Sequence, residues 1–116
     1  MRHRDKTTLK KILVAIDEAT EGLDNVSEET FLSSRILKLA MAMSVIRVGE
    51  LVKALTLEFR RDNPQVPWRE IAGFRDVATH KYDTIDMREL YGTIKKDFPK
   101  LKSQIEKILR VDKHDD

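Results

Sequence analysis

Residues 30–60 read TFLSSRILKLAMAMSVIRVGELVKALTLEFR, a stretch in which apolar residues recur at helical spacing. The pattern predicts one long helix from about Thr30 to Arg60. A first stripe follows a seven-residue repeat and consists of Leu32, Ile36, Leu39, Met43, Ile46, Lys53 and Leu57. A second stripe consists of Leu37, Met41, Val48, Leu51 and Leu55. A helix with two stripes can serve its own core and a neighbouring chain at once, or it can be the central helix of a bundle.

The rest of the chain also shows helical periodicity, and no segment has the alternating pattern of a strand. Glycine, proline and capping residues mark where helices start and stop. The predicted elements are a helix from near Lys6 to Gly22, a turn at Asp24–Ser27, a helix from Pro67 to about Tyr82, a capped helix starting at Asp86, and a last helix that Pro99 opens. This pattern is typical of an all-α protein, an antiparallel up-and-down bundle of four to five helices.

Length and composition fit a single domain over residues 1–116, with a frayed tail from about 111 to 116. The net charge is only +2, which argues against binding nucleic acid by bulk electrostatics but leaves room for a local basic cleft. The chain has no signal-type segment and no apolar run of membrane-spanning length, so we expect a soluble cytoplasmic protein without membrane contact.

Several kinds of chemistry are absent from the pattern. There is no cysteine, so the chain has no thiolate nucleophile and no sulfur-based zinc site. The three histidines lack metal-ligand spacing, and neither an HExxH pattern nor a glycine-rich phosphate loop occurs. We therefore expect no metal and no cofactor.

One segment, Arg75-Asp76-Val77-Ala78-Thr79-His80-Lys81-Tyr82, gathers an arginine, a histidine and a tyrosine, and we call it the signature segment. Guanidinium and imidazole are groups that hold a phosphodiester and move its protons. On a helical wheel, Arg75 and Tyr82 share the apolar arc with Trp68, an expected core anchor, whereas His80 points about 140° from Arg75. Either the helix ends or bends near His80, or the site is assembled from more than one chain.

Glu50 falls where the first stripe should continue with an apolar residue. Buried charges are usually paired, so one interpretation is an internal ion pair with Arg75 or Lys53 that fixes helix packing. The other is that Glu50 orients Arg75 toward a ligand.

The signature segment resembles the RX4HXY motif of HEPN-domain proteins, in particular the HepT-like toxins of two-gene toxin and antitoxin modules. Three further stretches resemble that family in order along the chain. They are Val48-Gly49-Glu50, the lead-in from Pro64 through Pro67-Trp68 and Gly73 to Arg75, and Asp97-Phe98-Pro99 followed by Leu101.

The resemblance implies a homodimeric HEPN-like bundle whose two signature segments meet in a cleft, and a metal-independent endoribonuclease that cuts RNA. Arg75 and His80 are then the catalytic pair, with Asp76 and Glu50 in support. Tyr82 is the tyrosine that a cognate nucleotidyltransferase antitoxin modifies with AMP. The family often has asparagine or histidine in place of Asp76 and glycine in place of Lys81; the extra carboxylate would slow cleavage or tune the histidine.

Two other functions fit the same residues. The chain is alternatively a non-catalytic HEPN module that binds a nucleotide or a nucleotidyltransferase partner through Arg75, with a structural His80. In a purely structural interpretation, the cluster is an ion-pair network that seals a dimeric bundle.

Overall fold

The computed structural model describes the backbone of residues 1–80 and 82–115, and the side chains of residues 1–74 and 83–112. Within these residues the chain is helical and contains no strand, which confirms the all-α class. The helices are α1 (His3–Gly22), α2 (Glu28–Ser33), α3 (Arg35–Lys53), α4 (Leu57–Asp62), α5 (Trp68–His80), α6 (Met87–Gly92) and α7 (Phe98–Asp115). A 3-10 turn, η1 (Tyr82–Thr84), and a π-helical turn, η2 (Thr93–Asp97), complete the structure.

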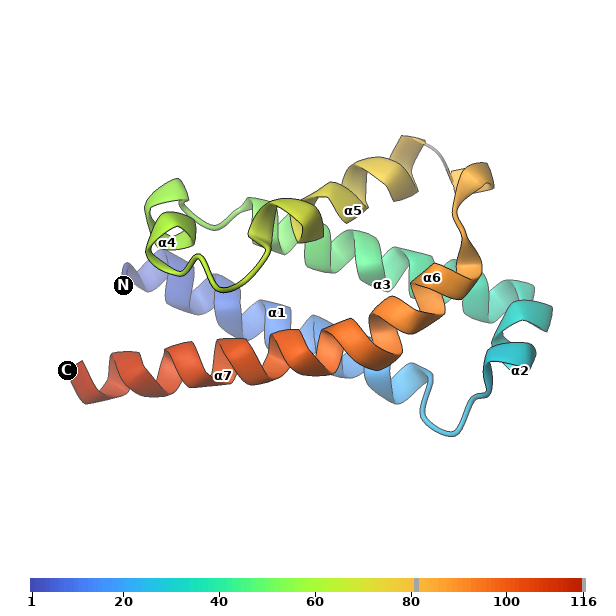
Figure 1. Ribbon diagram of the computed structural model, residues 1–116, viewed down its shortest axis with the longest axis horizontal. Coiled ribbons are helices and arrows are strands. Elements are labelled where there is room, and N and C mark those ends of the chain that lie inside the picture. The colour runs from blue at the N-terminus through green and yellow to red at the C-terminus, as the bar shows by residue number, and fades with distance from the viewer. Residues whose placement is uncertain (81, 116) are drawn as a thin grey trace.

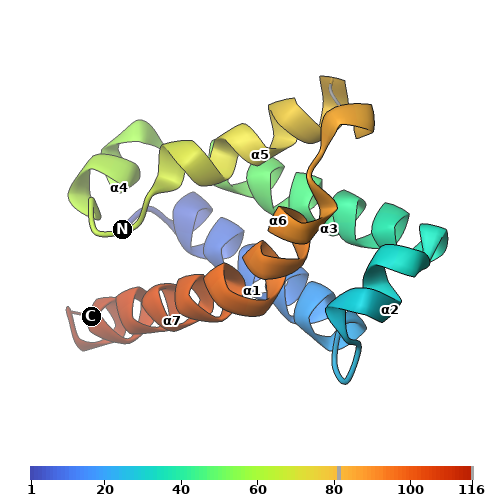
Figure 2. The same ribbon diagram turned by 45° about the vertical axis from the view of Figure 1, so that its right-hand side comes forward.

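Helix α3 lies at the centre of the bundle, with α5 packed along one side and α1 along the other (Figure 1). Helix α7 returns beside α1, so both ends of the chain lie at the same end of the molecule in both views (Figures 1 and 2). Ion pairs show the antiparallel register: Asp17 pairs with Lys102 at 2.8 Å, and the Met1 amino group pairs with Asp112 at 3.7 Å. The hydrogen bond and charge of Asp17 raise the pKa of the Lys102 ammonium.

One hydrophobic cluster runs through the helices and holds them together. Its largest fully buried side chains include Phe31, Phe98, Leu9, Ile12, Ile16 and Ile105. These residues come from α1, α2 and α7, so residues close to both ends of the chain contribute to the same core. No helix in the described part of the chain is long and apolar enough to cross a membrane.

The first predicted helix is confirmed, and it ends at Gly22 as expected. Asn25 follows in the left-handed region, with φ 59°, a conformation that asparagine tolerates better than most residues. The Ser27 side chain then accepts a hydrogen bond from the Thr30 amide at 3.1 Å and caps α2. The predicted turn is therefore a tight connection between the end of α1 and the capped start of α2.

The single helix predicted from about Thr30 to Arg60 is wrong, because the structure divides this stretch into α2, α3 and α4. Ser34 has an extended backbone, and its hydroxyl caps α3 by accepting from the Leu37 amide at 3.2 Å. Thr56 caps α4 in the same way, accepting from the Phe59 amide at 3.1 Å. Serine and threonine offer the backbone these alternative bonds, and helical periodicity alone does not reveal them.

Asp5 is the buried carboxylate that fixes the second of these breaks. It accepts hydrogen bonds from the Thr56 amide at 2.9 Å and from the Thr56 hydroxyl at 2.7 Å. Both carboxylate oxygens are thus satisfied by the residue that caps α4, which offsets much of the cost of burying the charge. This contact ties the start of α1 to the start of α4.

The start of α6 is confirmed, since the Asp86 side chain accepts from the amides of Arg88 at 2.9 Å and Glu89 at 3.3 Å. The last predicted helix is confirmed as α7, which begins at Phe98, one residue before Pro99, and follows α6 and η2 without a break. The Phe98 amide donates to the carbonyl of Thr93, five residues back. This wider turn accommodates Pro99, which has no amide hydrogen and would clash with a normal helical turn before it.

Candidate functional site

The N-terminal end of α5 is fixed by Trp68. This residue is buried, its indole nitrogen donates to the Asn63 carbonyl at 2.9 Å, and its ring centroid lies 5.6 Å from that of Phe59. Asn63 in turn donates its side-chain amide to the Phe59 carbonyl at 2.9 Å. The expectation that Trp68 is an anchor is confirmed, and the anchor sets the register of the residues that follow along α5.

Helix α5 packs along α3 and ends at His80. The sequence predicted either a helix that ends or bends near His80 or a site assembled from more than one chain. The structure shows that the helix ends at His80. The 3-10 turn η1 begins at Tyr82, so α5 ends two residues before the predicted end at about Tyr82. The predicted site side chains Arg75, Asp76, His80 and Tyr82 lie outside the described side chains.

Glu50 is exposed on α3, so its carboxylate is not a buried charge of the single chain. It borders a hollow of about 360 Å³ that also involves Arg47 and Met43 of α3 and Glu18 of α1. Arg47 was missed by sequence reasoning. The sequence did contain a signal for Arg47: it lies three residues before Glu50, so both side chains lie on neighbouring turns of one helix face.

The structure distinguishes the two apolar stripes of the predicted long helix. In the second stripe, Met41, Val48 and Leu55 are buried and the remaining two are half-buried, so this stripe faces the core. In the first stripe, by contrast, Ile36 is 80% exposed, Leu39 44% and Met43 64%. Glu50 lies seven residues after Met43 and therefore continues the same exposed face of α3.

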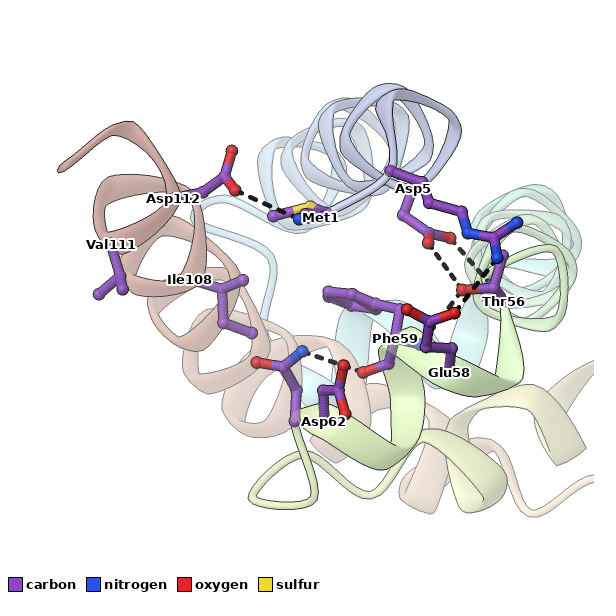
Figure 3. Close-up of a pocket in the computed structure, with 11 residues that line it drawn as sticks. Met1, Asp5, Thr56, Glu58, Phe59, Asp62, Ile108, Val111 and Asp112 are labelled. Carbon is purple, nitrogen blue, oxygen red and sulfur yellow. Dashed lines mark hydrogen bonds and ion pairs between the residues drawn. The ribbon is translucent and has the colours of Figure 1, made fainter. Parts of the chain in front are cut away.

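A separate hollow of about 380 Å³ lies where α1 begins, beside α4 and the last turns of α7 (Figure 3). Six of the residues that line it are paired with one another: Arg2 with Glu58 at 3.2 Å, Asp5 with Thr56, and Met1 with Asp112. We therefore assign this hollow a structural role. Among the described residues, no group of histidine, aspartate and glutamate side chains is arranged to hold a metal ion.

Phe74 was also missed by sequence reasoning. It directly precedes Arg75 on α5, is only half-buried, and borders two hollows, one toward α7 and one toward η1 and α6. The only sequence signal was an aromatic residue beside the signature segment.

Comparison with known proteins matches residues 12–108 to the family model described as Ribonuclease HepT-like. A protein of Caldanaerobacter subterraneus named "Putative RNase" is 37% identical over 105 residues, covering 90% of this chain and 94% of that protein. A protein of Thermococcus cleftensis named "Probable ribonuclease HepT" is 34% identical, covering 93% of this chain and 98% of that protein. No solved structure matches.

A Methanocaldococcus jannaschii protein named "Gamma-glutamylcyclotransferase and putative RNase" is 36% identical over 94% of this chain and 49% of its own length. The family match spans most of the chain and includes the signature segment, and two of these relatives are covered almost completely. The chain belongs to the HepT-like ribonuclease family.

Proposed function

We propose that this protein is the toxin of a two-gene module and cuts RNA in the cytoplasm without a metal ion, using Arg75 and His80. The observation that carries the proposal is α5 itself. It is anchored by Trp68, it ends at His80, and its sequence matches the arginine and histidine of the motif in a chain of the HepT-like ribonuclease family.

The chemistry follows from these two residue types. The 2′-hydroxyl of the RNA attacks the adjacent phosphorus, a base takes the hydroxyl proton, and an acid gives a proton to the departing 5′-oxygen. Imidazole serves as base or acid near neutral pH, and guanidinium grips the non-bridging oxygens and stabilises their growing charge. The products are a 2′,3′-cyclic phosphate and a 5′-hydroxyl, with no water consumed in this step.

A second copy of the chain supplies the other proton-transfer group in this proposal. The exposed part of the first stripe, Ile36, Leu39 and Met43, supports a homodimer, because exposed large apolar side chains in a row along one helix are typical of an interface. Glu50 lies on the same face of α3, so we propose that it supports the site from the dimer interface. Asp76, next to Arg75, is proposed to tune the charge around the phosphate.

We also propose that Tyr82 is modified with AMP by a nucleotidyltransferase antitoxin. An AMP group two residues from His80 adds bulk and negative charge, which repel an RNA backbone. Protein co-produced with a nucleotidyltransferase encoded by the adjacent gene should gain the mass of one or more adenylyl groups, mapped by peptide mass spectrometry to Tyr82. A silenced but unmodified protein would show that the antitoxin acts by covering the site.

The ribonuclease proposal is tested by incubating the purified protein with single-stranded RNA in excess chelator. We expect cleavage at an unchanged rate and 3′ ends that carry a 2′,3′-cyclic phosphate. Cleavage that needs an added divalent metal, or ends with a 3′-hydroxyl, would contradict the mechanism. Nucleotide binding without any cleavage would favour the second candidate function, the non-catalytic module, for which the aspartate at position 76 is the supporting observation.

A further inference from the structure

A groove lies between α5 and the beginning of α7, with a volume of about 290 Å³. It exists because α5 packs along α3 and has few contacts with α7, which leaves the other flank of α5 partly uncovered. Its apolar floor includes Ile71 and Phe74 from α5 and Phe98 and Leu101 from α7, and Gln65 and Gln104 lie at one end.

Charged side chains also border the groove, namely Glu70, Asp97 and Lys100. Carboxylates accept hydrogen bonds from the amino groups of a base, so the apolar floor and the polar border together suit a flat aromatic ligand with a polar edge. A half-buried phenylalanine offers a face on which a nucleobase can stack, and aromatic side chains are the usual platform for unstacked RNA bases. At the polar end, Gln104 donates to the Gln65 carbonyl over 3.3 Å, a long bond between exposed groups. The edge of a base can replace that bond at little cost, since an amide group both donates and accepts.

Size and position favour one base over other ligands. A volume of about 290 Å³ is at the lower end of small-molecule sites, so the groove accommodates one ring system but no helix of a partner protein. An apolar side chain of a partner would leave the amides at its end without new bonds. Phe74 directly precedes Arg75 on α5, and successive side chains on a helix point about 100° apart. The groove therefore lies on the flank of α5 next to the arc that carries Arg75 in the sequence pattern.

We propose that this groove binds one unstacked base of the RNA substrate, stacked on Phe74 and read at its edge by Gln104. The proposal rests on the proposed ribonuclease function, because the base that it binds belongs to the RNA that is cut at the signature segment. It makes Phe74 and Gln104 determinants of which base flanks the cut.

The probes are the four 3′-nucleoside monophosphates, titrated into isotope-labelled protein and followed by nuclear magnetic resonance, and a random-sequence RNA pool whose cut ends are sequenced. Phe74→Leu removes the ring but keeps an apolar side chain, and we expect binding about tenfold weaker with a weaker base preference at one position beside the cut. Phe74→Tyr keeps the aromatic ring and should retain both the binding affinity and the base preference of the unmodified protein. Phe31→Leu, the same change in the core contributed by α2, should bind like the unmodified protein.

Gln104→Ala leaves the core intact and should change which base is preferred rather than whether a base stacks. If the monophosphates change the resonance frequencies of Gln104 and Phe74 but the protein does not cleave RNA, the base-binding role of the groove is supported and the proposed ribonuclease function is refuted. If Phe74→Leu and Gln104→Ala cleave RNA with the same rate and base preference as the unmodified protein, the groove does not bind a substrate base. The proposed ribonuclease function is then unaffected. The proposal that the groove binds a base also fails if no monophosphate binds, or if binding changes only resonances of residues outside the groove.

Discussion

His80→Ala is expected to lower the rate of RNA cleavage by about a hundredfold to ten-thousandfold, the usual contribution of a general acid or base. It should also remove the growth inhibition expected of a toxin. The fold should survive, because α5 ends at His80 and is anchored at its other end by the Trp68 bond to the Asn63 carbonyl. The variant should keep the circular dichroism spectrum and the oligomeric state of the unmodified protein.

The matched control for this change is His3→Ala. His3 is exposed in the first turn of α1, outside the signature segment, so its loss removes an imidazole without affecting the proposed site. Cleavage rates of both variants, measured on one RNA with chelator present, separate the two roles. If His80→Ala cleaves as fast as His3→Ala, the histidine of the signature segment is not the proton-transfer group and the assignment fails.

Much of the helical structure was predictable because its signals are local. The end of α1 at Gly22, the cap at Asp86 and the anchor at Trp68 each depend on residues a few positions apart. The breaks at Ser34 and Thr56 were missed because apolar spacing continues through them. The Thr56 break also depends on Asp5, 51 positions earlier in the chain, a contact that no local pattern contains.

For the candidate site, the sequence predicts the residue types of the signature segment but not the surfaces that surround it. A motif specifies which residue types lie at which spacing, and the signature segment carries that information in eight consecutive residues. Periodicity could not decide which stripe faces the core, since both have helical spacing; burial of Val48 and exposure of Met43 result from how α1 and α5 pack on α3. The exposure of Glu50 and the groove beside Phe74 likewise result from how the helices pack against one another.

Met43→Glu is expected to separate the proposed dimer and, with it, to abolish cleavage. Met43 is 64% exposed at the C-terminal end of the exposed part of the first stripe, so a glutamate there should not disturb the fold of the single chain. In a two-fold interface the change occurs twice, and burying each charge costs at least ~2 kcal/mol. The dimer dissociation constant should therefore rise by about a thousandfold. Sedimentation or light scattering measures that change, and RNA cleavage at the same concentrations measures its effect on activity.

Val111→Glu provides the comparison, because Val111 is 53% exposed on α7 and lies outside both stripes. It introduces the same charge on another apolar surface residue and should leave mass and activity unchanged. Monomeric Met43→Glu that still cleaves at the normal rate would mean that one chain holds a complete site, since a cleft built from two signature segments cannot work in a monomer. A Met43→Glu protein that stays dimeric would instead place the interface elsewhere than the first stripe. Only joint loss of the dimer and of cleavage, with Val111→Glu unaffected, fits a site completed by the second copy.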